Sequence, residues 1–337
     1  MARLRDVAKH AGVSVSTASR VLTGDGYASK DARDRVLSSA RTLGYSPNHV
    51  ARSLRLQRTQ TIGLLVADLE NFFYSQIARG VADAARERNF HVVLATTDED
   101  PREEVRQLKL LRRLRVDGVI VTPTGANHTT IEEELGLGAM PLVQVDRRIP
   151  DLECDSVLVD NVGGARRAVR HLLALGHRRI GILAGDQRVT TGHERLRGFR
   201  EELEAHGLPP DESLIRATAF TRNAAVGSAT SLLSVGPRPT AIITANNILC
   251  EGAVRAIGAL GLDVPGDISI MSFDDTPWMS LLPAPISVVD QPAREMGSTA
   301  AALLFDRIDN PNVTGIREVV LHPTLHLRAS VAHCARS

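Results

Sequence analysis

The sequence predicts an all-α, helix-turn-helix head followed by an α/β core of two doubly wound parallel-sheet lobes. Three observations support this prediction. The first 45 residues hold short amphipathic helical patterns around a tight glycine turn. From Thr61 onward, continuous apolar runs of strand length alternate with helical patterns, which is typical of buried parallel sheets. The chain of 337 residues is also too long for one small core.

The head is predicted to contain three helices. The first follows from apolar residues at helical spacing, namely Leu4, Val7, Ala8 and Ala11. Gly12 then permits a sharp turn because it adopts a positive φ without a Cβ clash. Ser14 or Ser16 can cap a second helix over residues 16–22. A third helix is expected over residues 30–43, with Gly44 ending it and an inner face of Val36, Leu37, Ala40 and Leu43.

The stretch SPNHVARSLRLQRTQ forms a separate segment after the head. Pro47 suits the first position of a helix. The segment is short, basic and poor in apolar residues, so it is not expected to be stable as an isolated helix. We therefore predict a DNA-binding domain over residues 1–46, a hinge helix and linker over 47–60, and a core over 61–337.

The core is predicted from nine apolar runs, which are TIGLLVAD, HVVLATTD, DGVIVTPT, PLVQVDR, SVLVD, RRIGILAGD, TAIITAN, ISIMSFDD and ISVVDQ. Helical patterns lie between them, including residues 75–89, 102–115, 163–175 and 194–206. So many strands favour two lobes over one open sheet. The predicted limits are about 61–160 with 292–322 for the N-lobe, and about 161–290 with 323–330 for the C-lobe.

Charge is distributed unevenly along the chain. Residues 1–60 carry 11 Lys and Arg against 4 Asp and Glu, whereas the remainder carries 29 against 35. A basic head on a slightly acidic body indicates nucleic-acid binding by the head. The alternative interpretation is an ordinary solvated basic surface.

Several classes of protein are not expected. No apolar run reaches the roughly 18 residues that span a bilayer, and the charged N-terminus does not resemble a signal peptide. Cys154, Cys250 and Cys334 are scattered, odd in number and without metal-ligand spacing. The chain also lacks a nucleotide-binding phosphate loop and a Gly-x-Ser-x-Gly elbow. We expect a cytoplasmic, nucleoid-associated protein that is not an enzyme and has no metal or cofactor.

The second predicted helix carries the candidate base contacts, since the start of this helix enters the major groove in helix-turn-helix proteins. These are Val15, Ser16, Thr17 and Arg20, of which the arginine can bind a guanine bidentately. Candidate phosphate contacts, which set position without reading sequence, are Arg5, Ser14, Ser19, Thr23 and His49. The alternative is a small helical hairpin with a polar face.

Leu54 lies between Arg52, Ser53 and Arg55. An apolar side chain flanked by arginines is what a wedge that kinks the minor groove requires. The alternative is a core leucine of a linker helix, although few apolar residues nearby could bury it. Both interpretations remain open from these residues alone.

A ligand site is expected at the carboxyl ends of the core strands, in the cleft between the lobes. Polar residues follow several strands there, and Asp, Asn and Arg suit the vicinal hydroxyls of a sugar. Aromatic residues are only 3% of the chain, yet Phe72, Phe73 and Tyr74 are consecutive at a strand end. The alternatives are core packing for the phenylalanines and helix capping for the carboxylates.

The chain resembles the LacI/GalR family of bacterial regulators. The resemblance is carried by DVAKHAGVSVSTASRVLTG and GYSPNHVARSL in the head, and by TIGLLVADLENFFYSQIARGV, VLVDNVGGARRAVRHLLALGHRRIGILAG and SFDDTPW in the core. It extends over about residues 2–330. It implies a homodimer, a hinge helix that orders on DNA, an effector core like that of periplasmic sugar-binding proteins, and insertion of Leu54 at the centre of a palindromic operator.

The resemblance also implies effector-binding residues. Phe72, Phe73, Arg195, Asn247 and Asp274 match family positions that contact the effector, and Asp146, Thr191 and Phe220 match less closely. Two departures concern the ligand: many members have Asn-Pro where this chain has Asn71-Phe72, and Asp where it has Asn247. A carboxylate only accepts hydrogen bonds, whereas an amide accepts and donates.

Together these observations predict a sequence-specific transcription regulator, expected to be a repressor, whose operator affinity is controlled by a small molecule, in particular a sugar or sugar derivative. Residues 331–337 are too few for a heptad tail, which favours a dimer over a tetramer. The alternatives are a carbohydrate-binding protein of the periplasmic kind, which leaves the basic head unexplained, and a DNA-binding protein whose core binds no ligand.

Overall fold

The computed structural model describes residues 2–23, 27–45, 58–125, 131 and 140–334. The chain forms two compact units, Met1–Thr59 and Gln60–Ser337. Among the described residues, no helix combines the length and the apolar character that a bilayer crossing needs.

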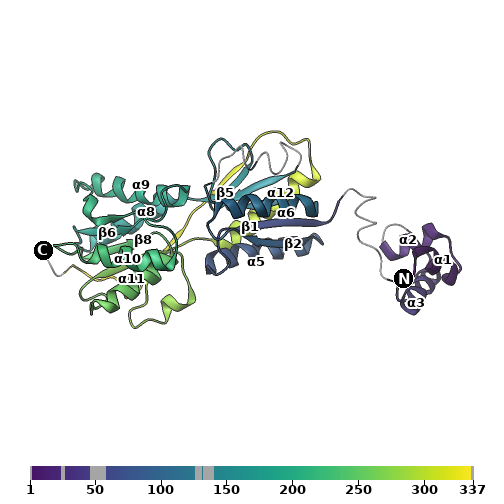
Figure 1. The fold of residues 1–337 in the computed structure, drawn as a ribbon, viewed down its shortest axis with the longest axis horizontal. Coiled ribbons are helices and arrows are strands. Elements are labelled where there is room, and N and C mark those ends of the chain that lie inside the picture. The colour runs from purple at the N-terminus through teal and green to yellow at the C-terminus, as the bar shows by residue number, and fades with distance from the viewer. Residues whose placement is uncertain (1, 24–26, 46–57, 126–130, 132–139, 335–337) are drawn as a thin grey trace. The chain divides into compact units, whose positions relative to one another are not determined.

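The first unit is a three-helix head composed of α1 (Leu4–Ala11), α2 (Val15–Thr23) and α3 (Lys30–Thr42) (Figure 1). Gly12 ends α1 with φ of +64°, as its freedom from Cβ contacts allows. Seven apolar side chains are buried together between the helices: Val7, Ala8, Ala11, Ala18, Val21, Val36 and Ala40.

Two details of the head differ from the prediction. Leu37 is 39% exposed and does not lie on the inner face of α3. Residues 36, 40 and 43 follow one helical stripe, whereas residue 37 is turned about 100° away from residue 36. Helix α2 starts at Val15 rather than at Ser16, because Ser14 is the residue whose side chain accepts a hydrogen bond from the first turn.

The second unit contains two six-stranded sheets. The first has the order β11-β5-β4-β3-β1-β2, and its strands are β1 (Thr61–Val66), β2 (His91–Thr96), β3 (Val119–Val121), β4 (Leu142–Val145), β5 (Asp155–Val159) and β11 (Glu318–Leu321). The second has the order β12-β10-β9-β8-β6-β7, and its strands are β6 (Ile180–Leu183), β7 (Ile215–Arg216), β8 (Ala241–Thr244), β9 (Ser269–Phe273), β10 (Ser287–Asp290) and β12 (Thr324–His326).

All strand pairs are parallel except β10 with β12. Each of the nine apolar runs forms a strand, which confirms the predicted fold class of a helical head and two parallel α/β lobes. The chain changes sheet after β5, after β10 and after β11. Buried apolar clusters cover both faces of each sheet, as buried parallel strands require.

Helices cover the sheets on both faces (Figure 1). Beside the first sheet lie α5 (Phe72–Glu87), α6 (Pro101–Leu114) and α12 (Ala293–Asp309). Beside the second lie α8 (Asn161–Ala174), α9 (Thr190–Ala205), α10 (Arg222–Leu233) and α11 (Asn247–Ala259), with short 3₁₀ turns at Glu212–Leu214 and Pro277–Ser280.

The four helices predicted in the core are present, but each begins earlier than its apolar pattern indicated. Asn71, Asp100 and Asp160 accept hydrogen bonds from the first-turn amides of α5, α6 and α8. These caps extend each helix in the N-terminal direction, beyond its first periodic apolar residue. Helix α9 begins at Thr190 without any side-chain cap.

Candidate functional site

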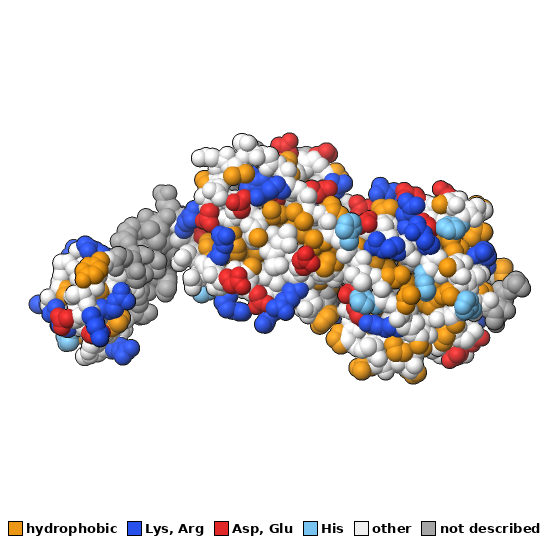
Figure 2. Space-filling model, turned by 180° about the vertical axis from the view of Figure 1, so that it is seen from behind, with side chains coloured by type: hydrophobic (Ala, Val, Ile, Leu, Met, Phe, Trp, Pro, Cys, Tyr) orange, Lys and Arg blue, Asp and Glu red, His pale blue; other side chains and the backbone are white. Residues whose placement is uncertain are grey.

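The start of α2 presents the side chains that the sequence assigned to base contact. Val15 is 43% exposed, so its side chain is accessible for apolar contact with a base. Ser16 and Arg20 are also exposed, and Thr17 is half-buried. Arg5 on α1 is exposed and Ser19 is half-buried. Figure 2 shows Lys and Arg side chains distributed over the visible face of the head.

A cluster of hydroxyl groups fixes the N-terminus of α2. The Ser14 Oγ accepts a hydrogen bond from the Thr17 amide at 3.0 Å. It also lies 2.8 Å from the Ser16 Oγ and 2.8 Å from the Thr17 Oγ1. Ser14 therefore caps the helix and positions the two hydroxyl groups that the sequence assigned to the groove.

The remaining predicted DNA contacts cannot be placed. His49, Arg52, Leu54 and Arg55 lie outside the described residues, as does the side chain of Thr23. Their roles stay predictions from the sequence.

In the core, the carboxyl ends of strands from both sheets enclose a small cavity, here called the central cavity. Its volume is about 10 Å³, enough for one water molecule. It is lined by Asn71, Phe73, Tyr74, Asp146, Arg147, Thr191, Arg195, Phe220, Asn246, Asp274 and Gln291.

Arg195 on α9 is the centre of the hydrogen-bond network at this cavity. Its Nε donates to the Asn161 Oδ1 at 2.8 Å, and one terminal nitrogen donates to the Gln291 Oε1 at 3.1 Å. Its other terminal nitrogen donates to the Ala245 carbonyl. The guanidinium carbon also lies 4.4 Å from the ring centroid of Phe273. Burial lowers the pKa of Arg195, whereas Asp274 and Asp146 oppose that effect.

Asp274, which follows β9, belongs to a chain of hydrogen bonds that connects residues of both lobes. Its Oδ2 accepts from the Asn247 amide at 3.2 Å, and its Oδ1 accepts from the Gln291 side chain. The Asn247 Nδ2 donates to the Asn71 Oδ1 at 2.8 Å, which connects α11 to the start of α5. Burial raises the pKa of Asp274, and Arg195 partly counteracts this.

Asp146, which follows β4 of the first sheet, is also buried and lines the central cavity. It accepts a hydrogen bond from the Tyr74 hydroxyl at 3.1 Å. Burial raises its pKa to about 6 against the opposing charges of Arg147 and Arg195. Arg147 binds Glu99 with two hydrogen bonds of 2.6 and 2.7 Å, and its guanidinium carbon lies 5.5 Å from the ring centroid of Phe220.

Two polar atoms at this site are buried without a hydrogen-bond partner among the described residues: the Asn247 Oδ1 and the Arg147 Nε. Leaving such a group unsatisfied costs about 1–3 kcal/mol. An acceptor and a donor are thus available for a bound polar molecule. Within the described part of the chain, no group of three or more His, Cys, Asp or Glu is arranged to hold a metal ion.

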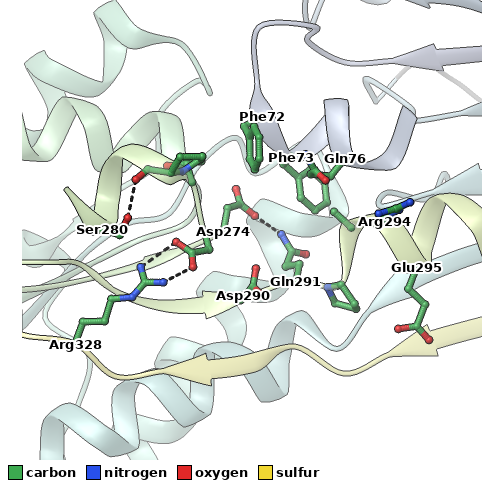
Figure 3. A pocket seen from close by; sticks show the side chains of 15 residues that line it. Phe72, Phe73, Gln76, Asp274, Ser280, Asp290, Gln291, Arg294, Glu295 and Arg328 are labelled. Atoms are coloured by element: carbon green, nitrogen blue, oxygen red, sulfur yellow. Dashed lines mark hydrogen bonds and ion pairs between the residues drawn. The ribbon is translucent and has the colours of Figure 1, made fainter. Parts of the chain in front are cut away.

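A larger cavity adjoins the central one, and Figure 3 shows it from close by. It has a volume of about 470 Å³ and shares Phe73, Asp274 and Gln291 with the central cavity. Phe72 lines it and is 38% exposed, which argues against simple core packing. Four carboxylates line this cavity, Asp274, Asp275, Asp290 and Glu295, and we call it the acidic cavity.

The structure brings the predicted effector residues close together. Phe73, Asp146, Thr191, Arg195, Phe220 and Asp274 line the central cavity, Phe72 lines the acidic one, and Asn247 contacts Asn71 and Asp274 beside them. Sequence reasoning did not single out Arg147 and Gln291. Arg147 directly follows Asp146 at a strand end, a signal that could have identified it, whereas Gln291 lies at a change of sheet.

Comparison with known proteins gives consistent results for head and core. Residues 3–48 match the model for bacterial regulatory proteins of the lacI family, and residues 169–331 match a periplasmic binding protein-like domain. The ribose operon repressor of Haemophilus influenzae is 34% identical over 98% of this chain and 99% of its own.

Two solved structures are similar to the whole chain. The Lac repressor dimer bound to operator and the anti-inducer ONPF has a TM-score of 0.86 and 28% identity, covering 98% of this chain and 99% of that one. The complex of the transcriptional regulator CelR with cellobiose has a TM-score of 0.73 and 33% identity, covering 98% and 100%. With this match in sequence and fold, the chain belongs to the LacI family of DNA-binding transcription regulators and is not an enzyme.

Proposed function

We propose that this protein is a repressor whose operator affinity is set by a sugar or sugar derivative bound at the central cavity. It acts as a cytoplasmic, nucleoid-associated homodimer on a palindromic operator. Val15, Ser16, Thr17 and Arg20 read bases, and Leu54 enters the minor groove between two half-sites.

The observation that carries the ligand assignment is the composition of the central cavity. Charged and amide groups converge there from both lobes, next to the rings of Phe73 and Phe220. The unpartnered Asn247 Oδ1 accepts and the unpartnered Arg147 Nε donates. Aromatic faces with convergent polar groups suit a molecule that has apolar ring faces and many hydroxyls.

The relatives support the same class of ligand. One is named as a ribose operon repressor, and another was solved with cellobiose. The Lac repressor structure contains a dimer, an operator and an anti-inducer together. The ligand contacts of this protein differ at Asn247 from those of family members that have a carboxylate at this position. The Asn247 side-chain amide donates to Asn71, which a carboxylate cannot do.

Ligand binding must change the arrangement of the lobes, because about 10 Å³ cannot hold a sugar. Three hydrogen-bonded or ionic contacts close the lobes together: Asn71 with Asn247 at 2.8 Å, Glu70 with Arg222 at 2.8 Å, and Thr190 with the Arg148 amide at 3.2 Å. Each contributes roughly 1 kcal/mol or less. A sugar with several hydroxyls can replace these three contacts with hydrogen bonds of its own. Ligand binding therefore shifts the equilibrium between the closed and open arrangements of the lobes.

In a dimer, a change in the arrangement of the two lobes of each core alters the spacing of the two DNA-binding heads. Both half-sites of the operator can then be bound at the same time in only one arrangement of the lobes. The coupling between ligand and operator is reciprocal and typically about 1–3 kcal/mol. Residues 47–56, which lie outside the described residues, are expected to fold on DNA, which adds an ordering cost at binding.

The test is a titration of selected operator DNA with the full chain, with and without sugars, at fixed ionic strength. A sugar that binds should change operator affinity by at least threefold. Arg195→Lys keeps the charge but loses the planar fork that reaches three acceptors, so it should abolish the response. Arg200→Lys, on the same helix and paired with Glu212, is the matched control and should retain it.

The alternative is a DNA-binding protein whose core only dimerises. Calorimetry with the full chain distinguishes the two. Heat of binding with a sugar, lost in Arg195→Lys and kept in Arg200→Lys, supports the proposal. An operator affinity that no sugar changes would contradict the ligand control and support the alternative of a DNA-binding protein whose core only dimerises.

A further inference from the structure

A third cavity lies between the lobes, separate from the acidic one. It has a volume of about 350 Å³ and is lined by residues that follow β3 and β4, together with the loop before α9 and the first turns of that helix. Arg147 lines both this cavity and the central one, which makes them neighbours. We call it the basic cavity because of the side chains that line it.

Positive charge dominates the lining. Arg147, Arg148, Arg188 and Arg197 line the basic cavity, against the single carboxylate of Glu194. Glu194 already accepts a hydrogen bond from the Asn161 Nδ2 at 3.1 Å. The carboxylates paired with the four arginines, which belong to Glu99, Glu318, Asp186 and Glu201, are not part of the lining.

Two of these ion pairs are weak enough to be exchanged. Arg148 and Glu318 are 46% and 45% exposed, and the Arg197 to Glu201 distance is 3.7 Å. Exposed pairs of this kind contribute little to stability. An anionic ligand can therefore recruit these guanidinium groups at small cost, and guanidinium groups bind phosphate and carboxylate bidentately.

The N-terminus of α9 adds a second source of positive potential. Val189 precedes the helix and has no side-chain acceptor to cap it. The helix is 16 residues long, so its dipole favours an anion at the first turn. The Thr190 hydroxyl accepts from the Arg148 amide of the other lobe at 3.2 Å, which places both lobes at this end of α9.

Arg147 supplies an observation that points to a ligand. Its side chain is 4% exposed, and its Nε has no hydrogen-bond partner among the described residues. The nearest carboxylate oxygen, on Asp146, is 3.7 Å from it, too far for a hydrogen bond. A buried cationic donor left open at the junction of two cavities is suited to an anionic or strongly accepting group.

The two outer cavities thus differ in the sign of their charge. The acidic cavity has four carboxylates against Arg294 and Arg328 (Figure 3), and the basic cavity has four arginines against one carboxylate. A neutral sugar gains nothing from this asymmetry. A ligand with an anionic end is attracted to one side and repelled from the other, so the asymmetry orients it.

We propose that the effector is a polyhydroxylated molecule that carries an anionic group, a phosphate or a carboxylate, with the hydroxylated part in the central cavity and the anion in the basic cavity. This inference rests on the proposed function and narrows its ligand class. Arg148, Arg197 and the first turn of α9 bind the anion, and Arg147 spans the two parts of the ligand.

The test is calorimetry of the full chain with matched probes. These are ribose and ribose 5-phosphate, glucose and glucose 6-phosphate, gluconate for the carboxylate, and inorganic phosphate alone. The anionic member of at least one pair should bind ten or more times tighter than its neutral partner, with an affinity that falls as salt rises. Comparing the affinities for inorganic phosphate and gluconate shows whether the basic cavity binds a phosphate or a carboxylate.

The double variant Arg148→Gln with Arg197→Gln removes two charges from the basic cavity and none from the central one. It should lose the preference for the anionic probe while keeping the affinity for the neutral sugar. Arg166→Gln with Arg170→Gln, a surface pair on α8 bound to Glu202, is the charge-matched control and should keep the preference.

The outcomes separate the two proposals. Neutral and anionic probes that bind equally, or neutral sugars that bind alone, overturn the anionic class and leave the sugar site intact. A double variant that keeps the preference overturns the placement of the anion. Failure of every probe to bind, together with an operator affinity that none of them changes, overturns both proposals.

Discussion

Replacement of Asn247 by Asp tests how the two lobes are held together. The Asn247 Nδ2 donates to the Asn71 Oδ1 at 2.8 Å, and the same Asn71 oxygen caps α5 through the Phe73 amide at 3.0 Å. A carboxylate cannot donate, so in Asn247→Asp two acceptors face each other. Asn71 cannot rotate its amide to compensate without losing the cap.

The magnitude follows from these contacts. The lost hydrogen bond is worth about 1 kcal/mol, and an unsatisfied buried acceptor costs about 1–3 kcal/mol more. Asp274 lies on the other side, where its carboxylate accepts from the Asn247 amide, so like charges also repel. We expect a loss of about 2–4 kcal/mol at pH 8. At pH 5 the loss is smaller, because a protonated carboxyl can donate to Asn71 again.

The assay is urea unfolding of the full chain at pH 5 and pH 8, following the transition of the core. Asn246→Asp is the matched control, since Asn246 is adjacent, is 7% exposed and caps α11 by accepting from the Leu249 amide at 2.9 Å. Aspartate caps as well as asparagine, so the control should lose little. Equal losses in both variants, or a stable Asn247→Asp at pH 8, would refute the reasoning.

Four further predictions concern the buried carboxylate, the helix packing and the DNA contacts. Asp146→Asn should raise core stability above pH 6 by up to about 3 kcal/mol. Burial raises the pKa of Asp146 to about 6, so the contribution of this group to stability falls as pH rises from about 4 to 6, and the stability gained by the variant over the wild type should grow across that range in urea unfolding. Gly80→Ala should destabilise the core by about 1–3 kcal/mol in thermal unfolding, because a Cβ at this position would lie 2.1 Å from the Arg294 carbonyl oxygen of α12. Gly227→Ala is the control: a Cβ there meets nothing within 4 Å, so this variant should be more stable by up to about 1 kcal/mol. Arg20→Ala should relax preference at one base position per half-site at a loss of about 1–3 kcal/mol, read from binding to single-base operator variants. Leu54→Ala should lose operator affinity but keep salt-dependent binding to random DNA, and equal loss of both would contradict the wedge.

Local signals were sufficient to predict most of the fold. The nine apolar runs are strands because parallel strands buried on both faces must be continuously apolar. The helix starts were less accurate, because Asn71, Asp100 and Asp160 extend α5, α6 and α8 beyond their apolar periodicity. The edge strands β7, β11 and β12 contain no fully buried residue, so they lack the long apolar run that marks a strand buried on both faces.

The candidate site was predicted as a set of residues but not as a network. Strand-end position and family resemblance identified Asp146, Arg195 and Asp274, since ligands bind at the carboxyl ends of parallel strands. The pairings depend on contacts between distant parts of the chain, such as Asn71 with Asn247, which are 176 residues apart. Cavity sizes and the opposite charge of the two outer cavities arise only when the lobes are folded together.

The central claim is that occupancy of the cavity between the lobes and operator binding are coupled. The direct measurement is a closed thermodynamic cycle on the full chain: operator affinity with and without a bound sugar or sugar phosphate, and affinity for that ligand with and without operator. The account predicts the same factor in both directions, of about 5–150. A ligand that binds the core yet leaves operator affinity unchanged would contradict it.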